Sequence, residues 1–274
     1  MPELPEVETV KNGLITHALG QSITHVLVRQ HSLRWPVIQN LAAKLEGQSI
    51  TTIHRRAKYI IVGLERGEII IHLGMSGAVY FQDPGQPWRK HDHILLTLGN
   101  GQQLRYHDPR RFGSWHWVAV DAQEHPLLKT LGPEPLSPAF DAEYLYAVTR
   151  NRSRVIKSLI MDQQVVVGVG NIYAAEALFE AKIHPLSQSK ALSLTHCKAL
   201  VAAIKKGLNT AIEAGGTTLR DFVNADAKPG YFKQQLAVYA REGQDCRRCN
   251  AKISSCRITQ RASAYCASCQ HLYQ

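Results

Sequence analysis

Four cysteines near the C-terminus have the spacing of a metal site. Cys246 and Cys249 form one C-x2-C pair, Cys266 and Cys269 form a second, and residues 250–265 separate the two pairs. This spacing is typical of a zinc ribbon, in which four thiolates bind one structural Zn2+ ion. Two disulfides are the alternative, but they require an oxidising compartment, and the chain shows no secretory signal pattern. The sequence therefore predicts one structural Zn2+ ion in a cytoplasmic protein.

The two remaining cysteines are not expected to bind this metal. Cys256 lies between the two pairs but lacks a C-x2-C partner of its own. Cys197 lies on the apolar face of a predicted helix, where packing in the core is the simpler role. We therefore expect the four paired cysteines to be the ligands.

The segment that carries the cysteines is strongly basic. Against Glu242 and Asp245 it has Arg241, Arg247, Arg248, Lys252, Arg257 and Arg261. A basic loop can simply be solvated, but the whole chain has 32 Lys+Arg against 22 Asp+Glu and a pI of about 9.4. Nucleic acid is therefore the expected partner. No apolar run approaches the length of a membrane span, so no membrane role is expected.

The N-terminus offers a candidate nucleophile. Removal of Met1 by ordinary processing exposes Pro2 as a free secondary amine, and Glu3 follows it directly. An α-amine has a pKa of about 7.7 to 8.0, so its neutral fraction can attack an electrophilic carbon while Glu3 gives or takes a proton. A helix start is the alternative, because Pro5 and Glu6 both suit a first helical turn. The residues alone leave both interpretations open.

A glycine-containing turn is a candidate phosphate site. Gly168 and Gly170 allow a tight turn, and Asn171 can cap the helix that follows. Free N–H groups at such a helix start suit a phosphate, although plain turn chemistry explains the same residues.

The elements that must position these residues fall into two groups. An amphipathic helix is predicted over 3–19, with Val7, Val10 and Leu14 on one face and Gly20 as its stop. Short runs rich in β-branched and aromatic residues, divided by turn signals, follow and indicate a β-sandwich. The predicted strands are 23–28, 50–54, 59–64, 68–73, 78–81, 94–98, 103–107 and 115–120.

Beyond Pro133 and Pro135 the composition becomes helical, which places a domain boundary near residue 134. Predicted helices cover roughly 139–149, 154–163, 171–182 and 192–214, and Gly215-Gly216 supplies the C-cap of the last one.

Several motifs in a fixed order give the chain a family resemblance. It resembles formamidopyrimidine-DNA glycosylase from residue 2 to the end, through the segments 1–10, 55–59, 72–77, 108–113, 167–173 and 215–219 and the terminal cysteines. The resemblance implies a bifunctional repair enzyme that removes oxidised purines, such as 8-oxoguanine and formamidopyrimidines, and then cuts the strand at the abasic site.

The resemblance also implies roles for individual residues. Pro2 would attack C1′ and form a Schiff base, Glu3 would be the acid/base group, and Lys58 matches the family's catalytic lysine. Glu6 matches an acid near the lesion, and Arg261 matches the arginine that holds the phosphate at the cut site. The strand would then be cut by β,δ-elimination.

Excision requires that the damaged nucleotide leave the duplex, and other matching residues would serve this step. Met75 and Phe112 would fill the gap and Arg110 would pair with the orphaned cytosine, although Met75 and Phe112 taken singly read as core residues. The residues that fall where the family contacts DNA phosphates are His91, Arg152, Lys157 and Asn171.

Together these inferences predict an α+β monomer that acts on damaged double-stranded DNA. Its parts would be a catalytic β-sandwich with a leading helix (1–134), a helical DNA-binding domain (135–240) and a zinc-ribbon β-hairpin (241–274). The helical domain would contain a helix-two-turn-helix motif and a lesion-capping loop at about 217–231. In that loop Ala227 stands where the family usually has glycine, and Cys256 is a second departure from the family pattern.

Two other functions fit parts of the pattern. One is an endonuclease VIII-like glycosylase for oxidised pyrimidines, a group that typically starts Pro-Glu-Gly-Pro-Glu, whereas this chain has Leu4. The other is a non-catalytic DNA-binding zinc protein on the same scaffold, which would have an unreactive N-terminus.

Overall fold

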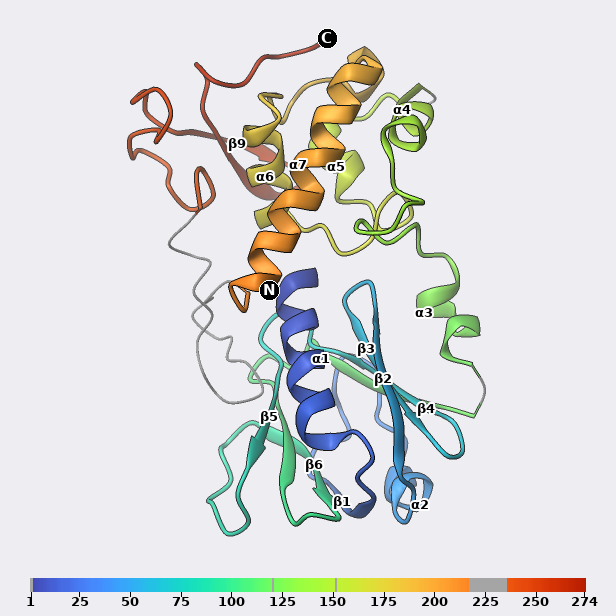
Figure 1. Cartoon of the computed structure of the whole chain (residues 1–274). Coiled ribbons are helices and arrows are strands. Elements are labelled where there is room, and N and C mark those ends of the chain that lie inside the picture. Colours follow the sequence, from blue (N-terminus) through green and yellow to red (C-terminus); the bar gives the residue numbers. More distant parts are fainter. Residues whose placement is uncertain (1, 120, 151, 217–235) are drawn as a thin grey trace. The chain divides into compact units, whose positions relative to one another are not determined.

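The chain divides into two compact units that are interleaved in sequence. The computed structural model describes residues 2–119, 121–150, 152–216 and 236–274 (Figure 1). Unit 1 comprises Met1–Lys129 and Ile212–Lys233, and unit 2 comprises Thr130–Ala211 and Gln234–Gln274. The finer division into three domains with boundaries at 134 and 240 stays a prediction, and the proposed capping loop at 217–231 lies outside the described residues.

Unit 1 begins with the predicted amphipathic helix, α1 (Leu4–Ala18). Glu3 is its N-cap, and the Glu3 backbone N–H donates to Oε2 of Glu6 at 2.8 Å, which completes a capping box. Val7, Val10 and Leu14 are buried on one face of the helix, at the spacing that predicted it. The chain then turns at Gly20, whose φ of 78° lies in the left-handed region.

Two four-stranded antiparallel sheets follow α1 and confirm the predicted sandwich (Figure 1). One sheet has the order β1-β6-β7-β5, formed by Ile23–Val28, Asp92–Leu98, Gln103–His107 and Ala78–Gln82. The other has the order β2-β3-β4-β8, formed by Ile50–Arg56, Tyr59–Leu64, Glu68–His72 and Ser114–Val118. Each strand agrees with its predicted range to within about two residues.

Side chains from both sheets and from α1 share one hydrophobic core. Ile60 and Ile71 of one sheet, Leu96 and Tyr106 of the other, and Leu14 of α1 all belong to it. Two short helices, α2 (Leu41–Leu45) and α3 (Pro126–Lys129), were not predicted, and a 3-10 helix covers Ala122–Glu124.

Unit 2 is helical, as predicted, and ends in a hairpin. Its elements are α4 (Ala142–Arg150), α5 (Ile156–Ile160), α6 (Asn171–Glu180), a 3-10 turn (Ser189–Ala191), β9 (Ser254–Ile258) and β10 (Arg261–Tyr265). The long helix α7 spans Leu194–Glu213 and buries Cys197 fully, as its predicted core role requires. Helix α5 is shorter than the predicted 154–163, because Val155 is extended and forms a β-bridge with Gln188.

The hairpin β9–β10 turns through Thr259 and Gln260, whose φ values are 43° and 63°. Two successive residues with positive φ match the twist of a two-residue antiparallel hairpin. The sheets, the helices and this hairpin beside the cysteines confirm the predicted α+β fold class with a ribbon-like C-terminal module. Among the described residues, no helix is long and apolar enough to cross a bilayer.

Candidate functional site

The start of α1 is a closely packed acidic segment. Pro2, Glu3 and Glu6 are all buried, and Glu6 is fully so. Because the Glu6 carboxylate accepts the backbone N–H of Glu3, it fixes the backbone position of Glu3. The helix-start interpretation of these residues is therefore correct, and it is compatible with chemistry at Pro2, since a capped helix holds the first residues in one place.

Lys58 lies in the tight turn between β2 and β3 and is only 8% exposed. The turn forces Ala57 into the left-handed region, with φ of 55°. Arg55 donates from Nη1 to the carbonyl of Ala57 at 2.8 Å and from Nε to Oε2 of Glu8 in α1 at 2.6 Å. The same arginine therefore joins the turn that carries Lys58 to the helix that begins at Glu3.

Electrostatics favour this ion pair. Burial raises the pKa of Glu8, but hydrogen bonds and charge from Lys11 and Arg55 outweigh it, so that the pKa is lowered overall. Glu8 is therefore ionised at neutral pH and holds Arg55 as a charged partner.

A neutral histidine lies beside Lys58. His72 at the end of β4 pairs with Tyr59, the residue after Lys58, and their rings are 4.8 Å apart. Desolvation, together with the positive charges of Lys58 and Arg34, lowers the pKa of His72 to about 4. The Nδ1 atom of His72 accepts the backbone N–H of Gly74 at 3.0 Å, which links the strand pair beside Lys58 to the turn that carries Met75.

Two exposed turns carry the predicted wedge residues. Met75 lies between β4 and β5 and Phe112 lies between β7 and β8, and each side chain is 40% exposed. The guanidinium of Arg110 lies 4.8 Å from the centre of the Phe112 ring. The alternative, in which Met75 and Phe112 are core residues, is therefore wrong, because both side chains are exposed. Large apolar side chains exposed on adjacent turns are typical of a binding surface.

His91 precedes β6 and lies in a group of histidines. Its ring centre is 6.2 Å from that of His93 and 5.9 Å from that of His107. Its carbonyl accepts the backbone N–H of Asp108 at 3.0 Å. His91 is therefore held at the end of the sheet that also leads into the Arg110 turn.

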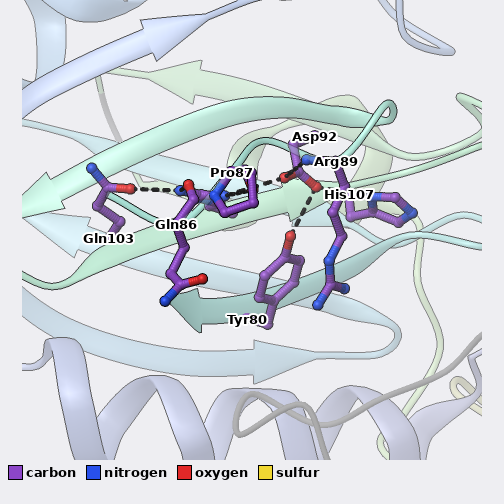
Figure 2. Close-up of polar contacts among 8 residues, drawn as sticks. Tyr80, Gln86, Pro87, Arg89, Asp92, Gln103 and His107 are labelled. Carbon is purple, nitrogen blue, oxygen red and sulfur yellow. Dashed lines mark hydrogen bonds and ion pairs between the residues drawn. The ribbon is translucent and has the colours of Figure 1, made fainter. Parts of the chain in front are cut away.

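A buried polar network fixes the loop that leads to His91 (Figure 2). Asp92 accepts from the hydroxyl of Tyr80 at 2.9 Å and from the backbone N–H of Arg89 at 2.9 Å, and its Oδ1 lies 2.9 Å from Nδ1 of His107. Burial raises the pKa of Asp92, but the hydrogen bonds from His107, Arg89 and Tyr80 outweigh it and lower the pKa overall.

Arg105 extends this network into the loop. It is 2% exposed and donates to the carbonyls of Gln86 and Pro87 at 2.8 and 2.9 Å, while its Nη1 lies 3.6 Å from Asp92. We had not predicted this network. Arg105 alternates in β7 with the core residues Leu104 and Tyr106, so the network lies on the other face of the sheet, where only the pairing of β6 with β7 brings Asp92 and His107 together.

In unit 2 the predicted phosphate-contact residues converge on the hairpin. Lys157 donates from Nζ to Oδ1 of Asn171 at 2.7 Å and to Oγ of Ser263 at 2.6 Å. Asn171 in turn donates to the carbonyl of Ala262 at 3.1 Å, directly beside Arg261. The structure therefore brings Lys157, Asn171 and the start of β10 together at the N-terminus of α6.

The predicted cap of α6 is wrong by one residue. Gly170 is the N-cap, and Asn171 is the first helical residue with its side chain turned to Lys157 and Ala262. Of the two glycines, Gly168 is the one with a positive φ, 79°, so the tight turn lies two residues before the N-cap.

Among the predicted DNA-contact residues of unit 2, Arg261 and Arg152 are more accessible than the buried Lys157. Arg261 is exposed at the first position of β10, next to the hairpin turn. Arg152 is partly exposed and lies 3.8 Å from Asp162, which Arg154 contacts more closely at 2.6 Å. Both positions suit contact with an anion from solvent.

The four paired cysteines form one cluster that fits Zn2+. Their sulfur atoms all lie within 4.8 Å of one another, with 3.9 Å between Cys246 and Cys269 and 3.5 Å between Cys249 and Cys266. A tetrahedral ion with Zn–S bonds of about 2.3 Å separates its sulfurs by about 3.8 Å, close to both values. Cys256 lies outside the cluster, on β9, with its sulfur 3.8 Å from the carbonyl of Ser263.

Helix α6 anchors the cysteine module. The carboxylate of Glu176 accepts the backbone N–H groups of Ala237, Val238 and Tyr239 at 2.7, 2.9 and 2.8 Å. Phe179 packs with Cys246 and Cys266 in one small hydrophobic cluster. The cysteine module therefore packs against α6, the helix whose first residue is Asn171.

Comparison with known proteins identifies the family. Residues 1–115 match the formamidopyrimidine-DNA glycosylase N-terminal domain, and residues 131–223 match the H2TH domain of the same enzyme. A formamidopyrimidine-DNA glycosylase of Hydrogenovibrio crunogenus is 52% identical over 270 residues, which cover 98% of this chain and 96% of the relative.

Solved structures agree with this match. A point mutant of the Lactococcus lactis FPG, in complex with a Fapy-dG containing DNA, is 34% identical with a TM-score of 0.92, and the match covers 98% of this chain and 100% of that one. A MutM structure in complex with carbocyclic 8-oxo-G containing DNA is 34% identical with a TM-score of 0.91 and the same coverage.

The two-sheet unit, the helical unit and the cysteine hairpin are thus those of a DNA glycosylase that acts in DNA repair. The chain belongs to the formamidopyrimidine-DNA glycosylase family. Lyase activity is typical of this family.

Proposed function

We propose that this enzyme excises oxidised purines, 8-oxoguanine and formamidopyrimidines, from duplex DNA and cuts the strand at the resulting abasic site. The observation that carries the proposal is the start of α1, where the capping box formed by Glu3 and Glu6 fixes an acid directly after Pro2. Relatives of 34% identity in complex with Fapy-dG or 8-oxo-G containing DNA support this choice of lesion.

Pro2 is the proposed nucleophile. Once Met1 is removed, the lone pair of the Pro2 nitrogen attacks C1′ and the bond from C1′ to the base breaks. The base leaves with that electron pair and takes up the proton that the Pro2 nitrogen loses. Glu3 then protonates the ring oxygen O4′, the sugar opens, and a Schiff base remains between Pro2 and C1′. The position of Glu3 suits this role, because it directly follows Pro2 and is fixed there as the N-cap of α1.

The Schiff base supplies the electron sink for strand cleavage. It acidifies the C2′ hydrogen, so that β-elimination releases the 3′ phosphate and a second elimination releases the 5′ phosphate. Lys58 is the proposed cation for the phosphate and the leaving group, and Arg261 the proposed cation for the phosphate at the cut site. The contact from Arg55 to Glu8 supports the placement of Lys58, because it fixes the Lys58 turn against α1.

Access to C1′ requires that the damaged nucleotide leave the stack. We assign Met75 and Phe112 to filling the gap, and Arg110 to pairing with the cytosine left behind. Their exposure on adjacent turns supports this assignment. His91, Arg152, Lys157 and Asn171 are assigned to the DNA phosphates, which fixes register without reading sequence.

Cys246, Cys249, Cys266 and Cys269 would hold one structural Zn2+ ion, whose chemistry is to tie the hairpin together through four thiolate bonds. The module places Arg261 beside Ala262 and Asn171, which supports a role in gripping the backbone. We further propose that the enzyme works as a monomer in the cytoplasm of a bacterial cell.

Paired excision assays test the choice of substrate. Release of 8-oxoguanine or a formamidopyrimidine from duplex DNA should be faster than release of thymine glycol. Faster release of thymine glycol would instead assign the chain to the endonuclease VIII-like group, which Leu4 already argues against. Binding of lesion DNA without release of any base would leave only the non-catalytic alternative.

A further inference from the structure

A buried carboxylate lies between the two exposed turns that carry Met75 and Phe112. Asp108 is fully buried and Ser76 is 4% exposed. The hydroxyl of Ser76 donates to Oδ1 of Asp108 at 2.7 Å, and the backbone N–H of Gly113 donates to Oδ2 at 2.8 Å. One carboxylate therefore contacts the residue after Met75 and the residue after Phe112.

Ser76 makes a second link in the opposite direction. Its Oγ accepts the backbone N–H of Arg110 at 3.2 Å, so the hydroxyl donates to one residue of the neighbouring turn and accepts from another. The two backbones also touch, since a Cβ on Gly74 would lie 2.3 Å from the carbonyl carbon of Phe112. No side chain other than hydrogen fits at Gly74 without moving one turn away from the other.

Both turns cross between the two sheets side by side. The Met75 turn runs from β4 to β5 and the Phe112 turn from β7 to β8, while β4 pairs with β8 and β5 pairs with β7. His72 faces Ser114 at one end of the turns and Ala78 faces His107 at the other. Strand pairing thus holds both ends of the two turns. In the middle of the turns, where no strands pair, the hydrogen bonds of Asp108 join them.

We propose that Ser76 and Asp108 are positioning residues that lock the two turns into one rigid wedge, so that Met75, Arg110 and Phe112 enter the duplex together. This inference rests on the proposed function. Unstacking a base step costs free energy, and a turn that bends under this load transmits less force to the base stack. Buried hydrogen bonds to an ionised acceptor resist such bending better than exposed ones.

The test compares two variants, each of which removes one hydroxyl group that donates a hydrogen bond to Asp108. Ser76→Ala removes the contact between the turns. Tyr106→Phe removes the 3.0 Å hydrogen bond of another fully buried hydroxyl to Oδ2 but leaves both links of Ser76 intact. Zinc-loaded, full-length enzymes are assayed in single turnover on duplex DNA with 8-oxoguanine and on the same duplex with a preformed abasic site.

The inference predicts a loss that depends on the substrate. Ser76→Ala should slow excision of 8-oxoguanine roughly tenfold, the effect expected for one lost hydrogen bond to a charged group, while cleavage of the abasic site changes less than about twofold because no base must be unstacked. Tyr106→Phe should stay within about twofold on both substrates, and Ser76→Thr, which keeps the hydroxyl, should restore excision.

A fluorescent base analogue next to the lesion supplies a direct readout. Its unstacking should slow in Ser76→Ala in step with excision, which a general loss of folding would not produce. Equal behaviour of Ser76→Ala and Tyr106→Phe, or an equal loss on both substrates, would overturn the inference. If Ser76→Ala does not fold, Ser76→Cys makes the same comparison with a weaker donor and acceptor. Failure of the proposed function differs from all of these, because the unmodified enzyme would then release no oxidised purine.

Discussion

Arg55 of β2 and Glu8 of α1 form a close ion pair, with Nε 2.6 Å from Oε2. Arg55 also donates to the carbonyl of Ala57, next to Lys58. The pair therefore joins two candidate catalytic segments that are 50 residues apart in sequence, from Glu8 to Lys58. A variant that breaks this ion pair therefore tests how much activity depends on the position of Lys58, because the charge of Lys58 is unchanged.

Glu8→Gln should slow strand cleavage at an abasic site about tenfold, because small displacements of a catalytic group have large effects on rate. Lys58 itself keeps its charge in this variant. Lys11→Met is the matched control, since Lys11 is the other cation on Glu8 and lies within α1 itself, three residues further along the helix. Equal rates for Glu8→Gln and the unmodified enzyme would show that Arg55 holds the turn unaided.

Removal of the metal should weaken DNA binding more than tenfold while unit 1 stays folded, because structural zinc supplies the folding energy of such a hairpin. All tryptophans, Trp35, Trp88, Trp115 and Trp117, lie in unit 1, so their fluorescence reports that unit alone. The measurement pairs metal content with DNA affinity in Cys249→Ser. Cys256→Ser is the control and should keep one Zn2+ per chain. Unchanged affinity after loss of the metal would refute the role of the hairpin in gripping the backbone.

Tyr80→Phe should lower the free energy of unfolding of unit 1 by about 1.5 to 3 kcal/mol, since it removes a buried hydrogen bond to the ionised Asp92. Desolvation and Asp92 raise the pKa of Tyr80 to about 12, so the hydroxyl stays a donor over the whole working range of pH. Urea unfolding followed by tryptophan fluorescence gives the value. Tyr144→Phe in unit 2 should leave this transition unchanged, and an equal shift in both variants would speak against a specific network.

Acid should destabilise unit 1 between about pH 6.5 and pH 4. Desolvation lowers the pKa of both His72 and His116 to about 4, with Lys58 adding to the effect on His72 and His125 to the effect on His116. Because the unfolded chain then binds more protons than the folded one, this stability is complete above about pH 6.5 and is lost as pH falls toward 4.

Urea midpoints measured across that window test the sign. The change with pH should be smaller in His116→Asn than in the unmodified enzyme. A midpoint that rises on acidification would contradict the assignment.

The elements of the fold could be predicted because each is encoded locally. Strand β3 is an apolar run between turn signals, and α1 repeats Val7, Val10 and Leu14 at helical spacing. The five-residue helix α2 (Leu41–Leu45) was missed because it is too short to show a period.

The site was predicted less completely than the fold. The cysteines and the acids after Pro2 are adjacent or regularly spaced, so the sequence displays them. The contacts of Asp92 join residues of different strands and those of Asp108 join two turns, so both depend on the order and register of the strands. Such networks become visible only when the strand order is known.

The account depends most on the nitrogen of Pro2. Borohydride reduction during turnover on 8-oxoguanine duplex should trap a covalent complex, and mass spectrometry of its peptides should place the deoxyribose on Pro2 with Met1 absent. Pro2→Gly should cut more slowly than the unmodified enzyme. An adduct on another residue, or active enzyme that still carries Met1 or an acylated Pro2, would contradict the central claim.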